Sequence, residues 1–253
     1  MDLGRKKKIL TMTNSKNVAV IITAAGTSTR MGGSVKKEYM PLGNGTVLSK
    51  CVAAFVCAAK HPKLGFNLSH LVITVPEDGS MGAVDAVSAF FSFQGDIQEK
   101  VHYVKGSETR QHSVYNAMSF LKDSNVKPDI VLIHDGARPF VTSRIIYDVI
   151  NAAEQEGAGV PGIPVVDTIK EISPMGIVAR HSPRKSLVAV QTPQGFDFTR
   201  LLFAHMQAIT DGKEYTDDSE IFGEYCGIVR IVPGDVKNIK ITYPGDLERG
   251  MKM

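Results

Sequence analysis

Residues 18–33, VAVIITAAGTSTRMGG, run from an unbroken apolar segment straight into a loop of small residues. The β-branched run 18–23 is typical of a strand that is buried on both faces. In the loop, Ala24, Ala25 and Gly26 allow backbone amides to come close to a ligand, and a turn of such amides attracts phosphate oxygens. The spacing is neither G-x-G-x-x-G nor G-x-x-x-x-G-K-[ST]. The stretch therefore predicts a central strand that ends in a phosphate-binding loop of another kind.

The first 157 residues continue this alternation of strand and helix patterns. Short apolar runs of the same kind lie at 71–75, 101–104 and 130–134. Segments of helical length and spacing lie at 47–60, 82–93, 110–121 and 143–156. Such alternation predicts an α/β protein with a Rossmann-like, mostly parallel sheet flanked by helices. Ligands bind such sheets beyond the carboxyl ends of the strands, so we expect the site in the loops that follow the strands.

The pattern changes after Gly157. Two β-prone pieces, 163–172 and 186–192, are separated by the turn-rich residues 173–176 and a polar stretch. They predict an extended β-arm over about 163–190. A two-stranded excursion is only marginally stable alone in water. We therefore expect the arm to pack on a second subunit in a homodimer.

Regular patterns return beyond the arm. Helical spacing is found at 198–210 and 216–225, and strand-like runs follow at 228–232 and 239–242. Since 253 residues are a tight fit for two full domains, we predict a single domain over 17–250 that includes the arm.

Composition and charge exclude several classes of protein. With 43% hydrophobic and 22% charged residues, the chain is neither disordered, collagen-like nor a coiled coil. The net charge is +3, but the first seventeen residues hold five basic residues and one acidic residue, so the remainder is close to neutral. This distribution argues against a nucleic-acid partner, which needs a basic face on the folded domain. We interpret residues 1–16 as a flexible basic tail, with an organellar transit peptide or an arm that contacts polyphosphate as the alternatives.

The sequence has no apolar run of the roughly 18 residues that a membrane span needs. The basic start lacks the apolar core of a signal peptide. These features favour a cytoplasmic protein with no membrane partner.

Charged residues accompany two of the predicted strand ends. Arg30 and Lys37 bring cations to the loop after 18–23, where they could neutralise charge on a transferring phosphoryl group. A glycine-rich surface turn with solvated cations is the alternative. Asp135 closes the run 130–134, where a buried carboxylate needs a partner such as Arg138 or a ligand. No third ligand follows His134 and Asp135 at suitable spacing, so we expect no metal site formed by the protein alone.

Seven short motifs occur in a fixed order along the chain. They are AAG with the following Arg30-Met31 and Lys37-Glu38-Tyr39, GSETRQHSV at 106–114, HDGARP at 134–139, VDTIK at 166–170, QTPQ at 191–194, YTDD at 215–218 and NIKIT at 238–242. In this order and spacing the chain resembles the 2-C-methyl-D-erythritol 4-phosphate cytidylyltransferases over about residues 17–247. Each motif alone is weak, whereas their number and order together are specific.

The resemblance implies a reaction and its catalytic residues. A phosphate oxygen of methylerythritol phosphate would attack the α-phosphorus of CTP and release diphosphate. Arg30 and Lys37 match the family's residues that stabilise the transition state. Lys36 is an alternative to Lys37, because the usual Pro-Lys is Val35-Lys36-Lys37 here. Mg²⁺ or another divalent cation would be bound mainly by the CTP phosphates.

The resemblance also assigns residues to the nucleotide. The matching positions are Ala24, Ala25, Gly26, Thr27, Ser28, Gly106, Ser113, Asp135 and Gly136. Thr109 and Gln111 are near the base-contacting loop. On the residues alone, Ser113 could equally be an ordinary residue at the start of a helix.

Further positions match the family's pocket for the acceptor, a polyol phosphate. They are Arg184, Lys240, Thr168, Asp135, Arg138, Thr216 and Thr242. In the family the arm reaches across a dimer, so Arg184 and Thr168 would serve the partner's site. Without the resemblance, Arg184 would be taken for a solvated cation in a polar turn.

Two alternatives remain at this stage. A ribitol-5-phosphate cytidylyltransferase would share the CTP machinery, although its loop resembles Ala-Gly-Gly rather than the Ala-Ala-Gly found here. A catalytically silent nucleotide-binding module would need none of Arg30, Lys37, Arg184 and Lys240, and all four are present.

Overall fold

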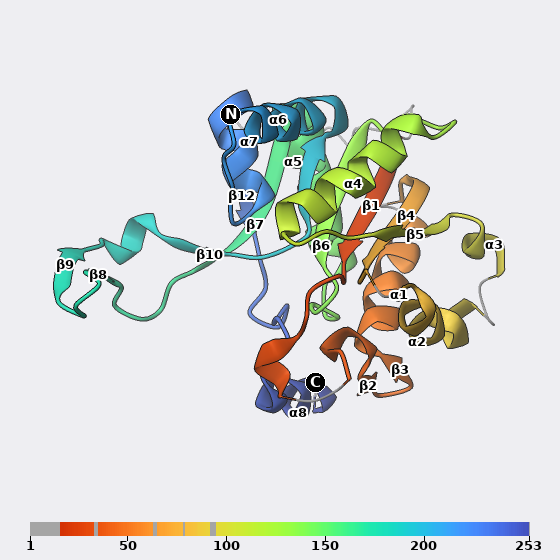
Figure 1. The fold of residues 1–253 in the computed structure, drawn as a ribbon, viewed down its shortest axis with the longest axis horizontal. Coiled ribbons are helices and arrows are strands. Elements are labelled where there is room, and N and C mark those ends of the chain that lie inside the picture. Colours follow the sequence, from red (N-terminus) through yellow and green to blue (C-terminus); the bar gives the residue numbers. More distant parts are fainter. Residues whose placement is uncertain (1–15, 33–34, 63–64, 78, 92–94, 253) are drawn as a thin grey trace, which may run out of the picture.

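A single large sheet forms the centre of the protein. The computed structural model describes residues 16–32, 35–62, 65–77, 79–91 and 95–252. Within them, eight strands are ordered β10-β7-β11-β6-β1-β4-β5, with β12 beside β7 (Figure 1). These strands are β1 (Asn17–Thr23), β4 (Asn67–Val75), β5 (Val101–Lys105), β6 (Ile130–Asp135), β7 (Ala158–Pro164), β10 (Val188–Val190), β11 (Gln194–Asp197) and β12 (Arg230–Pro233).

Two smaller sheets and the helices complete the architecture. The small sheets pair β2 (Pro41–Leu42) with β3 (Gly45–Thr46) and β8 (Lys170–Ile172) with β9 (Val178–His181). The helices are α1 (Val47–Ala59), α2 (Met81–Phe91), α3 (Gly95–Gln98), α4 (Arg110–Asp123), α5 (Ser143–Glu156), α6 (Phe198–Thr210), α7 (Asp218–Cys226) and α8 (Pro244–Met251). Short 3-10 turns occur at η1 (Thr29–Met31), η2 (Lys37–Tyr39) and η3 (Arg184–Ser186).

Strand β1 lies in the middle of the parallel part of the sheet. It pairs in parallel with β4 on one side and β6 on the other, and β4 pairs in parallel with β5. The register places Thr23 level with Thr74 and with Asp135. The carboxyl ends of these strands therefore meet in one row, as the predicted α/β fold requires.

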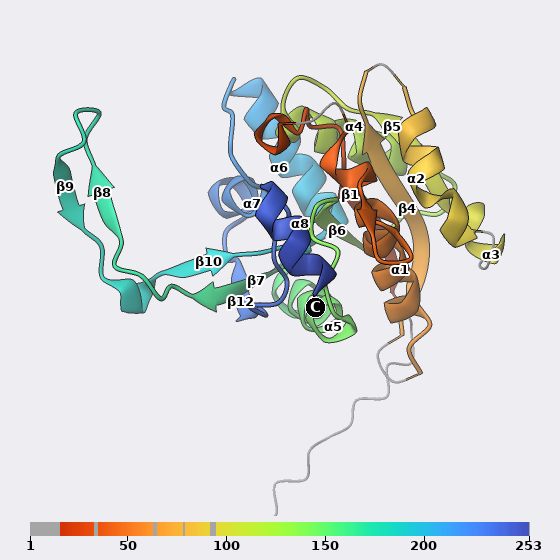
Figure 2. The ribbon, with the colours of Figure 1, turned by 90° about the horizontal axis from the view of Figure 1, so that it is seen from below.

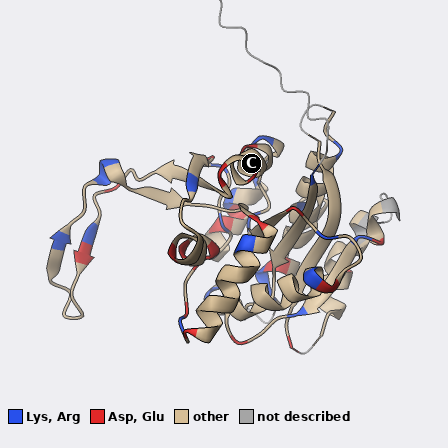
Figure 3. Cartoon of the chain, turned by 90° about the horizontal axis from the view of Figure 1, so that it is seen from above, with Lys and Arg blue, Asp and Glu red and all other residues tan. Residues whose placement is uncertain are grey.

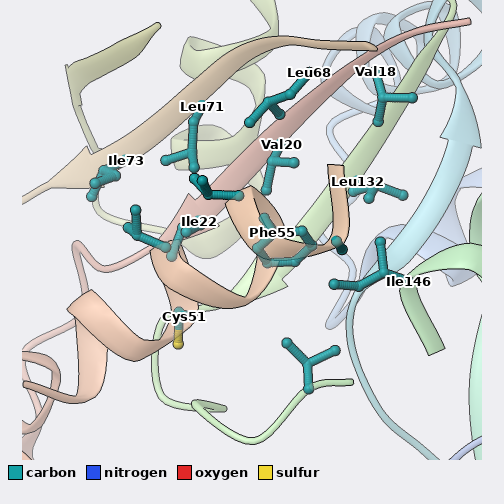
Figure 4. Close-up of a cluster of buried hydrophobic side chains, with 14 of the residues drawn as sticks. Val18, Val20, Ile22, Cys51, Phe55, Leu68, Leu71, Ile73, Leu132 and Ile146 are labelled. Carbon is teal, nitrogen blue, oxygen red and sulfur yellow. The ribbon is translucent and has the colours of Figure 1, made fainter. Parts of the chain in front are cut away.

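Side chains of β1 alternate between two apolar layers, because successive residues of a strand point to opposite faces. Val18, Val20 and Ile22 pack with α1, α2 and α5 on one face. Figure 4 shows Phe55 of α1 close to Val20 and Ile22 in this layer. Residues from α4, α6 and α7 pack with the opposite side chains of β1 on the other face. The sheet is thus covered by helices on both faces, which confirms the predicted fold class.

Polar caps explain where most of the helices begin. The side chains of Thr46, Thr109, Thr142, Asp197 and Asp217 each accept a hydrogen bond from a backbone N–H of the first turn of α1, α4, α5, α6 and α7. Such caps satisfy donors that have no partner within the helix. The predicted bounds 143–156 and 198–210 are confirmed, while α7 starts two residues later than predicted because Asp217 caps it.

The predicted arm is a long projection from β7 and β10. Figures 1 and 2 show β8 and β9 lying far from the helices of the body. Large apolar side chains along it are exposed, with Val166 at 81% and Met175 at 82% of their full accessibility. Basic residues occur on both strands of its hairpin and in η3 (Figure 3). The single chain confirms the extended arm, and the dimer stays a prediction.

Two strands of the sheet were not foreseen, because Gly and Pro disfavour strands. Strand β7 reads AGVPGIP, yet it pairs with β10, β11 and β12. A Cβ on Gly159 would lie 2.7 Å from the Val149 carbonyl oxygen, and one on Gly195 of β11 would lie 2.5 Å from Val149 Cγ1. The glycines let α5 pack directly on the sheet, so packing rather than propensity determines these strands.

The predicted strand at 239–242 is wrong. These residues have no strand partner, and the Ile241 backbone N–H donates to the Ala137 carbonyl instead. Ile241 is fully buried in a small cluster with Leu42 and Val47. The apolar side chain of Ile241 therefore holds residues 239–242 as a loop over the turn after β6. Helix α8 follows this loop and was also not foreseen.

No helix in the described part of the chain is long and apolar enough to cross a membrane. The predicted basic tail, apart from Lys16, lies outside the described residues. A cytoplasmic location and the tail's flexibility stay predictions.

Candidate functional site

A cavity of about 190 Å³ opens at the carboxyl ends of β1 and β6, beside the loop that follows β5. Its lining consists of Thr23, Ala25, Gly26, Lys37, Glu38, Ser107, Glu108, Thr109, Arg110, Ser113, Asp135, Gly136, Ala137 and Lys240. A second cavity of about 710 Å³ shares Ala25, Gly26, Ser107 and Glu108 with it. The two hollows therefore adjoin where a site was predicted from the strand order.

Hydrogen bonds to β4 and to η2 hold the loop after β1. The Ala24 N–H donates to Thr74 Oγ1 at 3.1 Å, which ties the loop to β4. The Ser28 hydroxyl donates to Glu38 at 3.0 Å and accepts from the Lys37 N–H at 3.3 Å. Ser28 has a φ of 55°, an uncommon backbone conformation for a residue other than glycine. These contacts fold η2 back over the loop and bring Lys37 to the cavity.

The two adjacent lysines have different surroundings. Lys37 lines the cavity, and its side chain is only 12% exposed, with Nζ 4.0 Å from Glu38. Burial lowers the pKa of Lys37, and the charges of Lys240 and Arg30 add to the decrease, while Glu38 opposes it. Lys36 instead donates to the Gly26 carbonyl and lies over the Tyr39 ring. The geometry therefore favours Lys37 over Lys36 as the cavity lysine.

Arg30 lies at the edge of this arrangement. It is exposed on η1 and is absent from the lining of both cavities, although its charge acts on Lys37. The predicted pair of cations is thus close together in space, with Lys37 inside the cavity and Arg30 outside its wall.

Asp135 is one of three carboxylates in the lining, with Glu38 and Glu108. Its Oδ2 lies 2.9 Å from Lys240 Nζ and 3.3 Å from Arg138 Nε. Burial would raise the pKa of Asp135, but Lys240, Arg110 and Arg138 outweigh it and hold the pKa well below its usual range. Arg138 also donates to the Asn238 carbonyl at 2.9 Å. The predicted partnership of Asp135 with Arg138 is confirmed, and Lys240 is a second partner.

His134 supports the turn that carries Asp135. Its Nε2 is 3.0 Å from the Arg138 carbonyl, so Nε2 carries the proton and donates. Nδ1 then accepts from the Thr192 hydroxyl at 3.1 Å, and that hydroxyl oxygen accepts from the Asp135 N–H at 3.0 Å. Burial lowers the pKa of His134 to about 4. A neutral His134 therefore fixes the backbone from Asp135 to Arg138.

The loop after β5 forms the opposite wall. A Cβ on Gly106 would lie 2.4 Å from Ala25 Cβ, so only glycine allows the two loops to touch here. Ser113 Oγ accepts from the Ser107 N–H at 2.9 Å and donates to the Thr109 carbonyl at 2.9 Å. Gly136 likewise lies against β1, since a Cβ there would be 2.9 Å from the Thr23 carbonyl oxygen. The predicted nucleotide-binding loops thus meet at one place.

Several predicted residues are not part of the cavity lining. Thr27 and Gly106 line only the second cavity, Arg138 lines neither cavity, and Ala24 and Ser28 belong to the loop after β1 without lining either cavity. Thr216 donates to Glu220, and Thr242 donates to the Lys240 carbonyl.

The arm holds two further predicted residues apart from the cavity. Arg184 begins η3 and donates to the Val166 carbonyl at 2.8 Å, Thr168 lies between β7 and β8, and neither residue is in the lining of the two cavities.

Arg110 and Glu38 are lining residues that the sequence analysis did not select. Arg110 opens α4 and forms an ion pair of 2.6 Å with the buried Asp218. Glu38 is 4% exposed and accepts from Ser28. Both residues lie inside family motifs, Arg110 in 106–114 and Glu38 beside Lys37. The motifs also contain many exposed residues, so membership of a motif does not identify a lining residue. Only the fold distinguishes them.

The donor set does not form a metal cage. Among the residues described, no three His, Cys, Asp or Glu side chains gather where they could hold a metal ion. The Asp135 carboxylate is already paired with two cations. The residues therefore fit a divalent cation that is carried mainly by phosphate oxygens, which suits Mg²⁺ because it retains waters and takes few protein ligands.

Fold and site together define a class. A parallel α/β sheet, with an amide-rich loop and basic residues at the carboxyl ends of its strands, is an architecture for binding phosphorylated ligands. The model of one family, 2-C-methyl-D-erythritol 4-phosphate cytidylyltransferase, matches residues 18–251. The chain belongs to this family, whose members are nucleotidyltransferases.

Individual relatives agree with this assignment. The 2-C-methyl-D-erythritol 4-phosphate cytidylyltransferase of Caldanaerobacter subterraneus subsp. tengcongensis is 38% identical over 91% of this chain and 96% of its own length. The bifunctional enzyme IspD/IspF of Bradyrhizobium sp. strain BTAi1 is 39% identical over 94% of this chain, which spans only 56% of that relative.

Solved structures show the same fold. The crystal structure of 4-diphosphocytidyl-2C-methyl-D-erythritol synthase from Anaerococcus prevotii has a TM-score of 0.75 and 26% identity, covering 94% of this chain and 95% of its own. The 2-C-methyl-D-erythritol 4-phosphate cytidylyltransferase of Francisella tularensis has a TM-score of 0.71 and 27% identity, covering 92% and 97%.

The surroundings of His134 predict a pH dependence of stability. Because the native pKa of about 4 is lower than the unfolded value of 6.5, stability is lost as the pH falls through this interval. We expect the unfolding free energy of the wild type to decrease between pH 7 and pH 5 by about 2 kcal/mol more than that of His134→Gln. Urea unfolding at both pH values measures this difference.

His181→Gln on the exposed arm is the control and should retain the wild-type pH dependence. An unchanged pH dependence in His134→Gln would contradict the assignment of a neutral His134.

Proposed function

We propose that this protein transfers a cytidylyl group from CTP to 2-C-methyl-D-erythritol 4-phosphate, in the non-mevalonate route to isoprenoids. The observation that carries the proposal is the meeting of the loop after β1 with the loop after β5, at a cavity that also holds Lys37 and Lys240. Amide groups and cations are what two anionic reactants need when they are brought together.

The chemistry needs no covalent nucleophile. An oxygen of the acceptor phosphate attacks the α-phosphorus of CTP, and the bond to the departing diphosphate breaks. Lys37 in the cavity, and Arg30 outside its lining, stabilise the added negative charge in the transition state, and their position on one loop supports this role. Orientation and electrostatics supply the catalysis.

Lys240 in the cavity lining, and Arg138 behind it beside Asp135, would hold the acceptor. Both contact Asp135, so their charges are partly balanced and their positions are fixed before the substrates bind. Thr216 and Thr242 match hydroxyl positions of the family's acceptor pocket and would contribute hydroxyl groups there. Mg²⁺ on the CTP phosphates would reduce the repulsion between the reactants.

We also propose that the active form is a homodimer in which the arm completes the partner's site. The support is the exposure of apolar side chains on the arm and the absence of Arg184 and Thr168 from the lining of this chain's two cavities. Arg184 would position the acceptor phosphate of the partner's site, because a guanidinium matches phosphate geometry.

Diphosphate release tests the proposed function. The protein is mixed with CTP and Mg²⁺, and methylerythritol phosphate and ribitol 5-phosphate are offered separately. We expect turnover with methylerythritol phosphate. Turnover with ribitol phosphate alone would overturn the assigned acceptor, and turnover with neither would indicate a nucleotide-binding module.

Lys37→Ala should lower kcat by a factor on the order of 10² to 10³, comparable to the loss of one group that stabilises a transition state. Lys36→Ala is the matched control, since its charge lies outside the cavity lining. Steady-state kinetics with both substrates measure the two effects. The reverse ranking of the two variants would show that the catalytic lysine is Lys36.

Mixing two inactive variants tests the exchange of arms. If Arg184 acts in the partner's site, a heterodimer of Arg184→Ala and Lys37→Ala chains contains one intact site. Random mixing of equal amounts should then restore about a quarter of the wild-type activity in a symmetric dimer. If Arg184 acts in its own chain, mixing restores nothing.

A further inference from the structure

The first residue of α4, Arg110, connects the cavity to a buried acidic group. Its Nη1 lies 2.6 Å from Asp218 Oδ2, and Asp218 is fully buried at the start of α7. The other oxygen of Asp218 lies 3.0 Å from Nε2 of His205, which is also fully buried, on α6. Arg110 itself reaches the cavity lining, and its side chain is 29% exposed. The three side chains thus form a line from the interior to the cavity wall.

The contacts of Asp218 determine its protonation state. Burial would raise the pKa of Asp218, but the Arg110 charge and the His205 hydrogen bond outweigh it and lower the pKa to about 2. The carboxylate is therefore ionised and accepts from His205 Nε2. Both oxygens of Asp218 are used, so the carboxylate holds Arg110 in one orientation.

A purely structural role is already filled by another residue. Gln111, the next residue of α4, donates to the Lys213 carbonyl at 3.1 Å and accepts from the Tyr215 N–H at 2.8 Å. These neutral hydrogen bonds join the start of α4 to the segment before α7. A buried ion pair adds little to stability when apolar packing could replace it. Stability alone therefore does not explain the charge on Arg110, so we look for its role where the guanidinium is exposed to the cavity.

The exposed part of Arg110 faces a place where negative charge would bind. Arg110 begins α4 directly after the loop whose Gly106 touches Ala25, and its charge helps to lower the pKa of Asp135. One guanidinium N–H group is used by Asp218, and Arg has five such donors.

We propose that Asp218 and His205 are positioning residues that fix the Arg110 guanidinium at the cavity wall, where it donates hydrogen bonds to oxygen atoms of the bound nucleoside triphosphate. The proposal rests on the proposed function for the identity of the nucleotide. It adds a third nucleotide-binding element, a guanidinium, to the loops after β1 and β5.

Calorimetric titration with CTP and Mg²⁺ tests this proposal on Asp218→Asn, Arg110→Ala and the double variant. We expect Asp218→Asn to weaken CTP binding by about 10- to 100-fold, the effect of one hydrogen bond to a charged group. Because Asp218 acts through Arg110, Asp218→Asn should have no further effect on the CTP affinity of Arg110→Ala.

A structural role would give a different pattern. Asp218→Asn would then lower the melting temperature while the Kd for CTP stays at the wild-type value, and this result would overturn the proposal. An equal loss of affinity in the presence and absence of Arg110 would also overturn it. Glu156→Gln is the matched control, because it breaks an exposed Arg230 ion pair of the same length, 2.6 Å, away from the cavity. It should retain the wild-type Kd.

The part of His205 is tested by two variants with different hydrogen-bonding ability. His205→Leu removes the donor to Asp218 and should weaken CTP binding, whereas His205→Gln can donate and should restore most of it. Equal affinity of both variants and the wild type would exclude His205 from the proposal.

These titrations separate the proposal from the proposed function. A wild type that binds CTP without transferring it to methylerythritol phosphate would contradict the proposed function alone. A wild type that turns over while Asp218→Asn binds CTP normally would contradict the positioning role alone. Absence of CTP binding by the wild type would overturn both.

Discussion

The attraction between the Asp135 carboxylate and the surrounding cations is the interaction on which the site depends. A buried carboxylate without partners would be strongly unfavourable. Lys240 and Arg138 contact it, and Arg110 adds its charge from the opposite wall. These cations come from three separate parts of the chain. The carboxylate therefore brings the turn after β6, the start of α4 and the loop before α8 to the same cavity.

The sheet provides the fixed frame for this arrangement. Parallel pairing of β1 with β4 and β6 aligns Thr23, Thr74 and Asp135 at the same edge. The Thr74 hydroxyl then holds the loop after β1, and His134 holds the turn after β6. Buried hydrogen bonds of this kind fix backbone positions, because each broken bond would leave a polar group unsatisfied. The loops that line the cavity are thus attached to the buried strands at the centre of the sheet.

Close backbone approach is a second constraint. Gly106 allows the loop after β5 to touch Ala25, and Gly136 allows the turn after β6 to lie against Thr23. A side chain at either position would clash within 3 Å. The size of the cavity therefore depends on two glycines as well as on its charges. The arm differs from these loops, because it projects from the body and its apolar side chains are exposed.

The local pattern of the sequence determined much of the fold. Apolar runs and helical spacing were sufficient for β1, β6, α5 and α6, because the signal for such elements lies within a few neighbouring residues. The ordered motifs also indicated the family and the loops that meet at the cavity. By contrast, β7 forms despite two glycines and two prolines, because the strands that pair with it, β10, β11 and β12, lie far away in the sequence.

Only the tertiary structure decided the environment of each charged residue. It distinguished Lys37 from Lys36 and selected Arg110, whose partner Asp218 is 108 residues away. It also turned 239–242 into a loop over Ala137 instead of a strand. Burial and charge pairing are properties of groups that meet in space, whereas a sequence pattern reports on neighbours along the chain. That difference is the physical reason why the helices and strands could be predicted from the sequence. The contacts between charged side chains at the cavity could not.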